Sequence, residues 1–156
     1  MLQGLFALLF ATSGLGVGPI SGDAELYAPP PPPPENRLVS AQLGLDTGVG
    51  VYADCSRVTD LTHESAAIDA CLPGRNYFIG HNPGVFTPLL NTQVGDTITY
   101  YDAGGNAHPY RVVGIRTWNR FWGSPPFVEP DVVAQFQTCI TLDATWDQIL
   151  DAVPAA

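Results

Sequence analysis

Residues 74–115 read GRNYFIGHNPGVFTPLLNTQVGDTITYYDAGGNAHPYRVVGI, and this stretch decides the fold. Its apolar run 76–80 predicts a strand ending in Gly-His, which places the imidazole of His81 at a strand terminus before a loop. Segments 94–102 and 107–115 flank the Gly-rich turn AGGN and predict a β-hairpin. Short strands joined by Gly- and Pro-rich turns indicate a mainly β domain.

The same pattern continues on both sides of this stretch. Further strands are predicted at 37–45, at 49–53 after the turn signal DTG, and at 133–142. Residues 62–71 fit a short helix with a threonine at its N-cap. The C-terminal run TWDQILDAVP (145–154) fits either a helix, from its apolar spacing, or a last strand. Because no long amphipathic helix is predicted, we expect a β-barrel or a β-sandwich.

Composition excludes several classes of function. The 156-residue chain has a net charge of −9, and its six basic residues are all Arg. It therefore lacks the basic stripe of a nucleic-acid-binding protein, and an acidic surface repels phosphate and anionic lipid headgroups. Without Lys, Schiff-base chemistry is excluded, as is any amine nucleophile other than the N-terminus.

The N-terminal part of the chain differs in character from the rest. Residues 2–20 carry no charge, so 1–22 is interpreted as a secretory signal or membrane anchor, with a buried core segment as the alternative. The proline run in 23–36 favours a stiff polyproline II linker over a ligand for an aromatic-lined groove. The domain itself is predicted at 37–156. We expect it to lie outside the cytoplasm, either membrane-anchored or secreted.

The chain has three cysteines, so at least one stays outside any intramolecular disulfide. Cys55 and Cys71 are the natural pair if the domain is exported, and two buried free thiols are the alternative. That pairing leaves Cys139 free. The spacings C-x-x-C and H-x-x-x-H are absent, so neither a metal site nor a cofactor is predicted.

A free cysteine becomes a nucleophile when a neighbouring group takes up its proton. The thiol is mostly protonated at neutral pH, and a histidine can supply charge and carry the proton. Cys139 is the candidate nucleophile, and His81 is the candidate proton carrier because of its position at a strand end. His63 is expected to be solvated on a polar helix and His108 to be exposed beside the hairpin turn. Asp96 is expected to stabilise a turn.

These motifs together resemble the sortase family, the exported cysteine transpeptidases of mainly Gram-positive bacteria. The resemblance covers about residues 37–142, from a first strand like RLVSAQLGLDTGVGVY to a strand that ends in Thr138-Cys139. The motifs between them follow the family's order: Pro73-Gly74, Ile79-Gly80-His81, Phe86 to Leu89, Gly95-Asp96 and Tyr110-Arg111-Val112.

The resemblance implies a closed eight-stranded β-barrel with short helices and a groove that holds His and Cys. It implies that the Cys139 thiolate attacks a backbone carbonyl in an LPXTG-like sorting signal of a secreted protein, giving a thioester. An amine from a cell-wall precursor or a pilin lysine then resolves it. His81 would protonate the leaving amine and deprotonate the incoming one, and Thr138 would help to shape the site.

One feature departs from the family pattern. Sortases carry an Arg on the last strand, but no Arg follows Arg120 here, and Trp146 or Gln148 occupies that place. Gln148 can donate only a neutral hydrogen bond, which is about half as strong as a charge-assisted one. Arg120, flanked by aromatic residues, or Arg116 is expected to replace the missing Arg, with Arg120 the better candidate.

Three interpretations stay open at this point. The main one is a cysteine transpeptidase whose activity is weakened or differently tuned by the missing Arg. The second is a catalytically degenerate peptide-binding module on the same barrel. The third is a cysteine hydrolase that releases the peptide to water.

Overall fold

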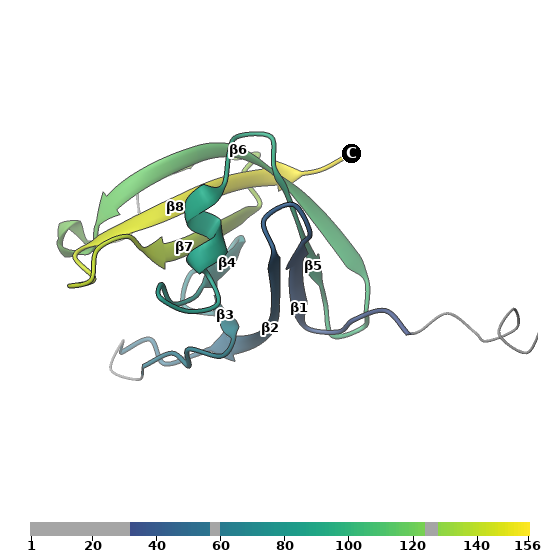
Figure 1. Ribbon diagram of the computed structural model, residues 1–156, viewed down its shortest axis with the longest axis horizontal. Coiled ribbons are helices and arrows are strands. Elements are labelled where there is room, and N and C mark those ends of the chain that lie inside the picture. The colour runs from purple at the N-terminus through teal and green to yellow at the C-terminus, as the bar shows by residue number, and fades with distance from the viewer. Residues whose placement is uncertain (1–31, 57–59, 124–127) are drawn as a thin grey trace, which may run out of the picture. The chain divides into compact units, whose positions relative to one another are not determined.

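Eight strands close into one barrel in the order β1-β2-β3-β4-β7-β8-β6-β5 (Figure 1). The computed structural model describes residues 32–56, 60–123 and 128–156. The predicted apolar segment 1–22 and most of the predicted linker 23–36 lie outside these residues. The strands are β1 (Arg37–Ser40), β2 (Leu45–Tyr52), β3 (Ala66–Asp69), β4 (Asn76–Ile79), β5 (Thr97–Tyr101), β6 (Ala107–Asn119), β7 (Ala134–Cys139) and β8 (Trp146–Pro154).

Two 3-10 turns complete the described elements, η2 (Thr87–Asn91) and η3 (Arg120–Trp122). No helix in the described residues is long and apolar enough to cross a membrane. The eight-stranded closed barrel confirms the fold class that the sequence predicted. In Figure 1 the long strands β6 and β8 run side by side, and they are hydrogen-bonded over most of their length.

The barrel is filled by an aromatic core. Phe78 on β4 and Phe136 on β7 are register partners whose rings stack with centroids 5.0 Å apart. Tyr100 and Tyr110 pack against them at angles. Full burial of one such side chain stabilises the fold by roughly 1.5–3 kcal/mol. Phe78 and Phe136 face the core, so the neighbouring residues on β4 and β7 face the other side of the sheet.

The predicted helix at 62–71 is wrong. Residues Ala66–Asp69 form β3, which pairs in parallel with β2 and antiparallel with β4. An isolated helix of ten residues is marginal by itself, whereas both alanines at the start of this strand are buried between two neighbouring strands. Tertiary pairing therefore overrides the local helix signal.

Two further expectations are settled by strand pairing. The turn expected at DTG lies instead at 41–44, and residues 46–48 belong to β2. The C-terminal segment adopts the strand alternative, because β8 is antiparallel to both β6 and β7 and closes the barrel. An amphipathic helix at this place would leave both neighbours with an open edge.

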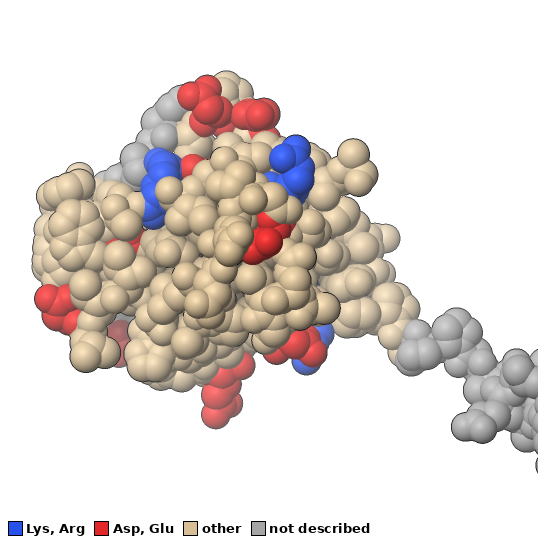
Figure 2. Space-filling model, turned by 45° about the horizontal axis from the view of Figure 1, so that its top comes forward, with Lys and Arg blue, Asp and Glu red and all other residues tan. Residues whose placement is uncertain are grey.

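The barrel surface carries scattered charges. Figure 2 shows the basic side chains as separate patches on the visible face, with acidic side chains distributed around them. No continuous basic stripe crosses that face, in keeping with the composition. The chemistry of the site must therefore come from individual side chains and not from a general surface charge.

Candidate active site

Two parallel strands bring the candidate nucleophile and the candidate proton carrier to one end of the barrel. β4 and β7 pair with Ile79 opposite Gln137. Continuing this register by two residues sets His81 level with Cys139. Both side chains line a cavity of about 360 Å³. Its wall also includes Tyr52, Asp60, Leu61, Asp69, Leu72, Tyr77, Ile79, Gly80, Trp118, Arg120, Gln137 and Thr138.

Local packing explains why the Gly-His pair stands at this strand end. A Cβ on Gly80 would lie 2.7 Å from the ring of Phe86, which is fully buried in the core. Phe86 and Leu89 both face inward, as expected for the turn that follows His81. Glycine at position 80 therefore lets the aromatic ring pack directly against the backbone beside His81.

Side chains tie the ends of β4 and β7 together. The hydroxyl of Thr138 donates to the carbonyl of Gly80 at 2.9 Å, and it is almost fully buried. The amide nitrogen of the Asn82 side chain donates to the carbonyl of Cys139 at 2.8 Å. Thr138 therefore contributes to the shape of the site through the backbone. Asn82 adds a second link that sequence reasoning missed.

The imidazole of His81 is oriented by a backbone carbonyl. Its Nε2 lies 3.0 Å from the carbonyl oxygen of Leu61, in the loop before β3. A carbonyl only accepts, so in the neutral ring Nε2 carries the hydrogen and Nδ1 holds the free lone pair. This tautomer leaves one basic nitrogen for proton transfer.

His63 is exposed, as expected, but it lies in a bend and not on a helix, and its ring stacks on His81. The two imidazoles stack with centroids 4.0 Å apart and planes 15° apart. The Nδ1 atom of His63 also lies 3.2 Å from the carbonyl of Pro83. The loop before β3 thus holds His81 from one face as well as through Leu61. No local signal marks this contact in the sequence.

Arg120 supplies the cation beside the sulfur. Its Nη2 lies 3.5 Å from Sγ of Cys139 and 3.3 Å from Oδ1 of Asp147. Cys139 and Asp147 are register partners on β7 and β8. Burial and the carboxylate of Asp147 raise the pKa of the Cys139 thiol, while the Arg120 guanidinium lowers it.

The other candidates for the missing Arg do not reach Cys139. Arg116 is held by Asp151, with Nε 2.6 Å from Oδ2 and Nη2 2.8 Å from Oδ1. Gln148 donates from Nε2 to the carbonyl of Leu89 at 2.9 Å, so it secures η2 against the barrel. In this register Gln148 and Cys139 face opposite sides of the sheet, because alternate residues of a strand do so. A substrate-supporting role of Gln148 stays a prediction.

Trp146 precedes Asp147 on β8 and packs against η3. Its ring makes an edge contact with Trp122, with centroids 5.1 Å apart. The residue of β8 opposite Cys139 is Asp147, which the sequence analysis did not single out. An acid therefore stands between the two positions, 146 and 148, where the resemblance placed the missing Arg, and the cation comes from η3.

The remaining candidates lie outside this cluster. Cys55 and Cys71 form a disulfide, with sulfur atoms 2.02 Å apart, and Cys139 is free. His108 pairs with Asp102 at 2.9 Å on the surface. Oδ2 of Asp96 accepts from the backbone of Gln93 at 2.8 Å, as a turn-stabilising residue would. The described residues contain no group of His, Cys, Asp or Glu arranged to hold a metal ion.

Comparison with known proteins identifies the fold. No protein-family model and no curated protein sequence matches the chain. Among solved structures, sortase C1 from Streptococcus suis matches with a TM-score of 0.63 and 14% identity, covering 80% of this chain and 74% of that one. Sortase A from Corynebacterium diphtheriae, a lid mutant, matches with a TM-score of 0.58 and 15% identity, covering 77% and 69%.

A third similar structure is sortase A from Listeria monocytogenes, with a TM-score of 0.58 and 13% identity. It covers 77% of this chain and 86% of its own. The chain therefore has the sortase fold. At this level of identity the likeness concerns the architecture, so the roles of the site residues rest on the geometry given above.

Proposed function

We propose that this chain is a sortase-like cysteine transpeptidase that cleaves an LPXTG-like sorting signal and transfers the acyl fragment to an amine. The observation that supports this best is the contact of Arg120 with Cys139 in a cavity that His81 also lines. A nucleophile, a proton carrier and an oxyanion donor are the three parts that acyl transfer by cysteine uses, and the donor here is cationic.

The proposed reaction has two halves. The Cys139 thiol gives its proton to the free nitrogen of His81, and the thiolate adds to the scissile carbonyl carbon. The tetrahedral intermediate carries negative charge on oxygen, which the Arg120 guanidinium stabilises. His81 then returns the proton to the leaving amine as the peptide bond breaks, which leaves a thioester on Cys139.

An incoming amine completes the transfer. His81 removes a proton from it as it attacks the thioester carbonyl, and the thiol leaves with a proton. If water takes the place of the amine, the same steps give hydrolysis. Because burial raises the pKa of Cys139, the thiol is the main form at neutral pH, and the first proton transfer controls how much nucleophile is present.

The experiment that tests this proposal uses a fluorogenic LPXTG-like peptide, with and without an oligoglycine or a lysine side-chain amine. Mass spectrometry should detect a thioester on Cys139 and, with the amine present, a transpeptidation product. Cys139→Ala is the control that must form neither. A thioester that yields only the free acid in the presence of amine would indicate the cysteine hydrolase.

One observation favours a second candidate, a catalytically silent peptide-binding module. Asp147 lies opposite Cys139 and raises the pKa of its thiol, which works against thiolate formation. Such a module would bind the sorting peptide in the same cavity without forming a thioester. Peptide binding to wild type that persists in Cys139→Ala, with no covalent adduct in either, would support this candidate.

The cellular setting belongs to the same proposal. Residues 1–22 would export or anchor the chain, and 23–36 would hold the domain away from the membrane as a proline-rich spacer. The partners would be secreted proteins with C-terminal sorting signals and amine acceptors of the cell wall or pili. Fractionation of cells that express the full chain, followed by protease treatment of intact cells, tests this location.

A further inference from the structure

We propose that Asp147 is a positioning residue that holds the Arg120 guanidinium against Cys139, at the end of a partly buried hydrogen-bonded chain that begins at Tyr77. The role in peptide transfer rests on the proposed function. The arrangement itself can be tested on the thiol alone.

Each link of this chain is visible in the structure. The Tyr77 hydroxyl donates to Oε1 of Gln137, and Nε2 of Gln137 donates to Oδ2 of Asp147 at 2.8 Å. The other carboxylate oxygen, Oδ1, accepts from Nη2 of Arg120 at 3.3 Å. The same Nη2 reaches Sγ of Cys139 at 3.5 Å. Both oxygens of Asp147 are therefore engaged, one by the barrel wall and one by the cation.

Burial makes this carboxylate depend on its partners. Asp147 is fully buried, and burial raises its pKa while Arg120 lowers it. A buried carboxylate without a cation and hydrogen-bond donors strongly destabilises the fold. Burial, together with the charge of Asp147, also raises the pKa of Tyr77, which keeps that hydroxyl protonated as the first donor of the chain.

The effects on the sulfur show where the benefit of Asp147 must lie. Its negative charge raises the pKa of Cys139, whereas Arg120 lowers it. A carboxylate whose only influence was on the thiol would slow the reaction. Its useful contribution is therefore the placement of Arg120 within reach of both the sulfur and the substrate carbonyl.

Arg120 keeps donors free for a substrate. Both of its contacts use Nη2, and within the described part of the chain neither Nε nor Nη1 makes a hydrogen bond. Its side chain is 43% exposed and lines the cavity. One nitrogen thus fixes the guanidinium, while the others are available to a developing oxyanion.

The test is a double-mutant cycle with Asp147→Asn, Arg120→Gln and the double variant. The first readout is the pH midpoint for alkylation of Cys139 by iodoacetamide, with the Cys55–Cys71 disulfide kept oxidised. In the wild-type background, Arg120→Gln should raise this midpoint. In the Asp147→Asn background, Arg120→Gln should change it much less, because the guanidinium has already been released.

The second readout is kcat/KM for transpeptidation. Asp147→Asn should lower kcat/KM at least tenfold although it lowers the alkylation midpoint, and the double variant should be no slower than Arg120→Gln. Opposite changes in thiol reactivity and turnover are not expected from a residue that only stabilises the fold. Asp151→Asn is the matched control and should move neither readout in the folded protein.

Two outcomes overturn the proposal. One is an equal shift of the alkylation midpoint by Arg120→Gln in both backgrounds. The other is a loss of kcat/KM in Asp147→Asn that adds in full to that of Arg120→Gln. If wild type transfers no peptide, the proposed function fails, and the alkylation cycle still decides the arrangement. If Arg120→Gln does not fold, Arg120→Lys takes its place. This substitution should change the alkylation midpoint when Asp147 is present and should leave it unchanged in Asp147→Asn.

Discussion

The barrel contains two clusters of Gln, Asp and Arg that have the same composition and different geometry. Each takes its Gln from β7, its Asp from β8, and its Arg from β6 or the turn directly after it. The first, which we call the barrel cluster, consists of Gln135, Asp151 and Arg116. The second, the site cluster, consists of Gln137, Asp147 and Arg120.

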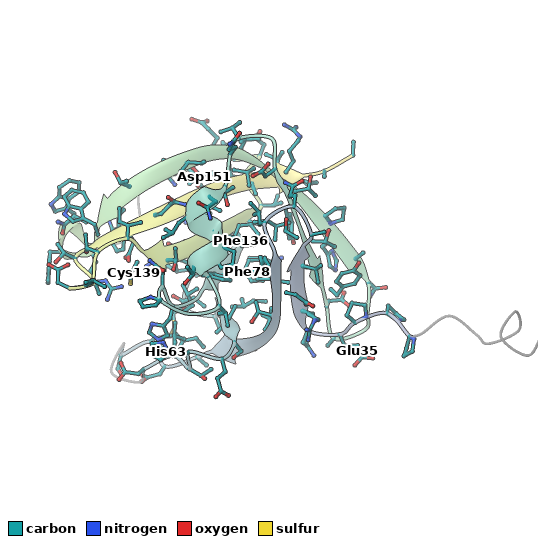
Figure 3. The ribbon with its side chains drawn as sticks, viewed as in Figure 1. Glu35, His63, Phe78, Phe136, Cys139 and Asp151 are labelled. Carbon is teal, nitrogen blue, oxygen red and sulfur yellow. A yellow bond between two sulfur atoms is a disulfide. The ribbon has the colours of Figure 1, made fainter. Side chains whose placement is uncertain are left out.

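The barrel cluster is closed. Arg116 binds Asp151 through two nitrogens at 2.6 and 2.8 Å, and Gln135 donates to the same carboxylate at 2.7 Å. The Arg116 side chain is 28% exposed. Such bidentate pairs combine strength with fixed orientation. In Figure 3 Asp151 lies toward the middle of β8, whereas Cys139 lies at the end of β7.

The site cluster is open. Arg120 makes one longer contact with the carboxylate of Asp147, and its second contact is with the sulfur of Cys139. Its side chain is 43% exposed. The comparison teaches that the same three residue types serve stability where two guanidinium nitrogens bind the carboxylate, and serve a site where only one does. The predictions below test this contrast, beginning with the largest expected effect.

Loss of the nucleophile or of the proton carrier should have the largest effect. Cys139→Ala and His81→Ala are each expected to lower kcat for transpeptidation on the order of 10³-fold or more, and the double variant should be little worse than either. The fluorogenic peptide assay with an amine acceptor measures this. His108→Ala, on the surface beside Asp102, is the control and should keep wild-type turnover. Near-native turnover by His81→Ala would remove it from the mechanism.

The two arginines should separate activity from stability. Arg120→Ala should lower kcat/KM at least tenfold, about 1.4 kcal/mol in barrier. It should reduce the free energy of unfolding by less than Arg116→Ala does, because a single longer contact joins Arg120 to its carboxylate. Arg116→Ala should reduce the free energy of unfolding by about 1–3 kcal/mol, because it leaves a mostly buried carboxylate short of donors. Its kcat/KM should stay near wild type. Urea unfolding and steady-state kinetics on both variants decide, and the reverse assignment would break the comparison.

The sequence predicted the barrel and the positions of His81 and Cys139, but it did not predict the site cluster around them. The Gly-His strand end and the terminal cysteine of β7 depend on short local patterns, so both positions and the barrel were accessible from sequence. Which residue of β8 faces Cys139 depends on register, since a shift of one residue exchanges Asp147 for Gln148. The tail contains no motif that fixes this register. Asp147 therefore emerged only from the structure.

Two other features depend on contacts between distant segments. The stack of His63 on His81 joins a loop before β3 to one after β4, and nothing in either local sequence indicates it. The helix predicted there failed for the same reason, because pairing with β2 and β4 outweighs a weak local preference. Arg120 was preferred over Arg116 for its aromatic neighbours, yet its contacts in the structure are Asp147 and Cys139. The catalytic roles of all these residues stay predictions.

The buried carboxylate of the site cluster should give the fold a specific pH dependence. Burial raises the pKa of Asp147 above its ordinary value, so the folded state binds this proton more tightly than the unfolded state does. The stabilisation is complete below the unfolded pKa of about 3.9 and is lost as pH rises through the raised folded value. Asp147→Asn should therefore gain stability relative to wild type as pH rises from about 3.5 to 7.

Urea unfolding of both proteins across this pH range measures the difference. If it stays constant with pH, the carboxylate is not destabilised by its burial, and the electrostatic part of the comparison fails. The partners of Asp147 would then offset the cost of burying its carboxylate. The readout does not depend on any peptide substrate, so it stands apart from the proposed function.

The smallest expected effect concerns the stack of His63 on His81. An aromatic pair of this kind contributes about 0.5–1.5 kcal/mol, so His63→Ala should lower kcat/KM roughly two- to tenfold by letting the His81 ring leave its orientation. His63→Phe keeps a flat ring over His81 and should recover most of the loss, although it cannot titrate or hydrogen-bond to Pro83. Recovery by Phe would assign His63 a packing role. If Phe is as slow as Ala, a polar atom of His63 is required instead, and the stack alone does not hold His81 in place.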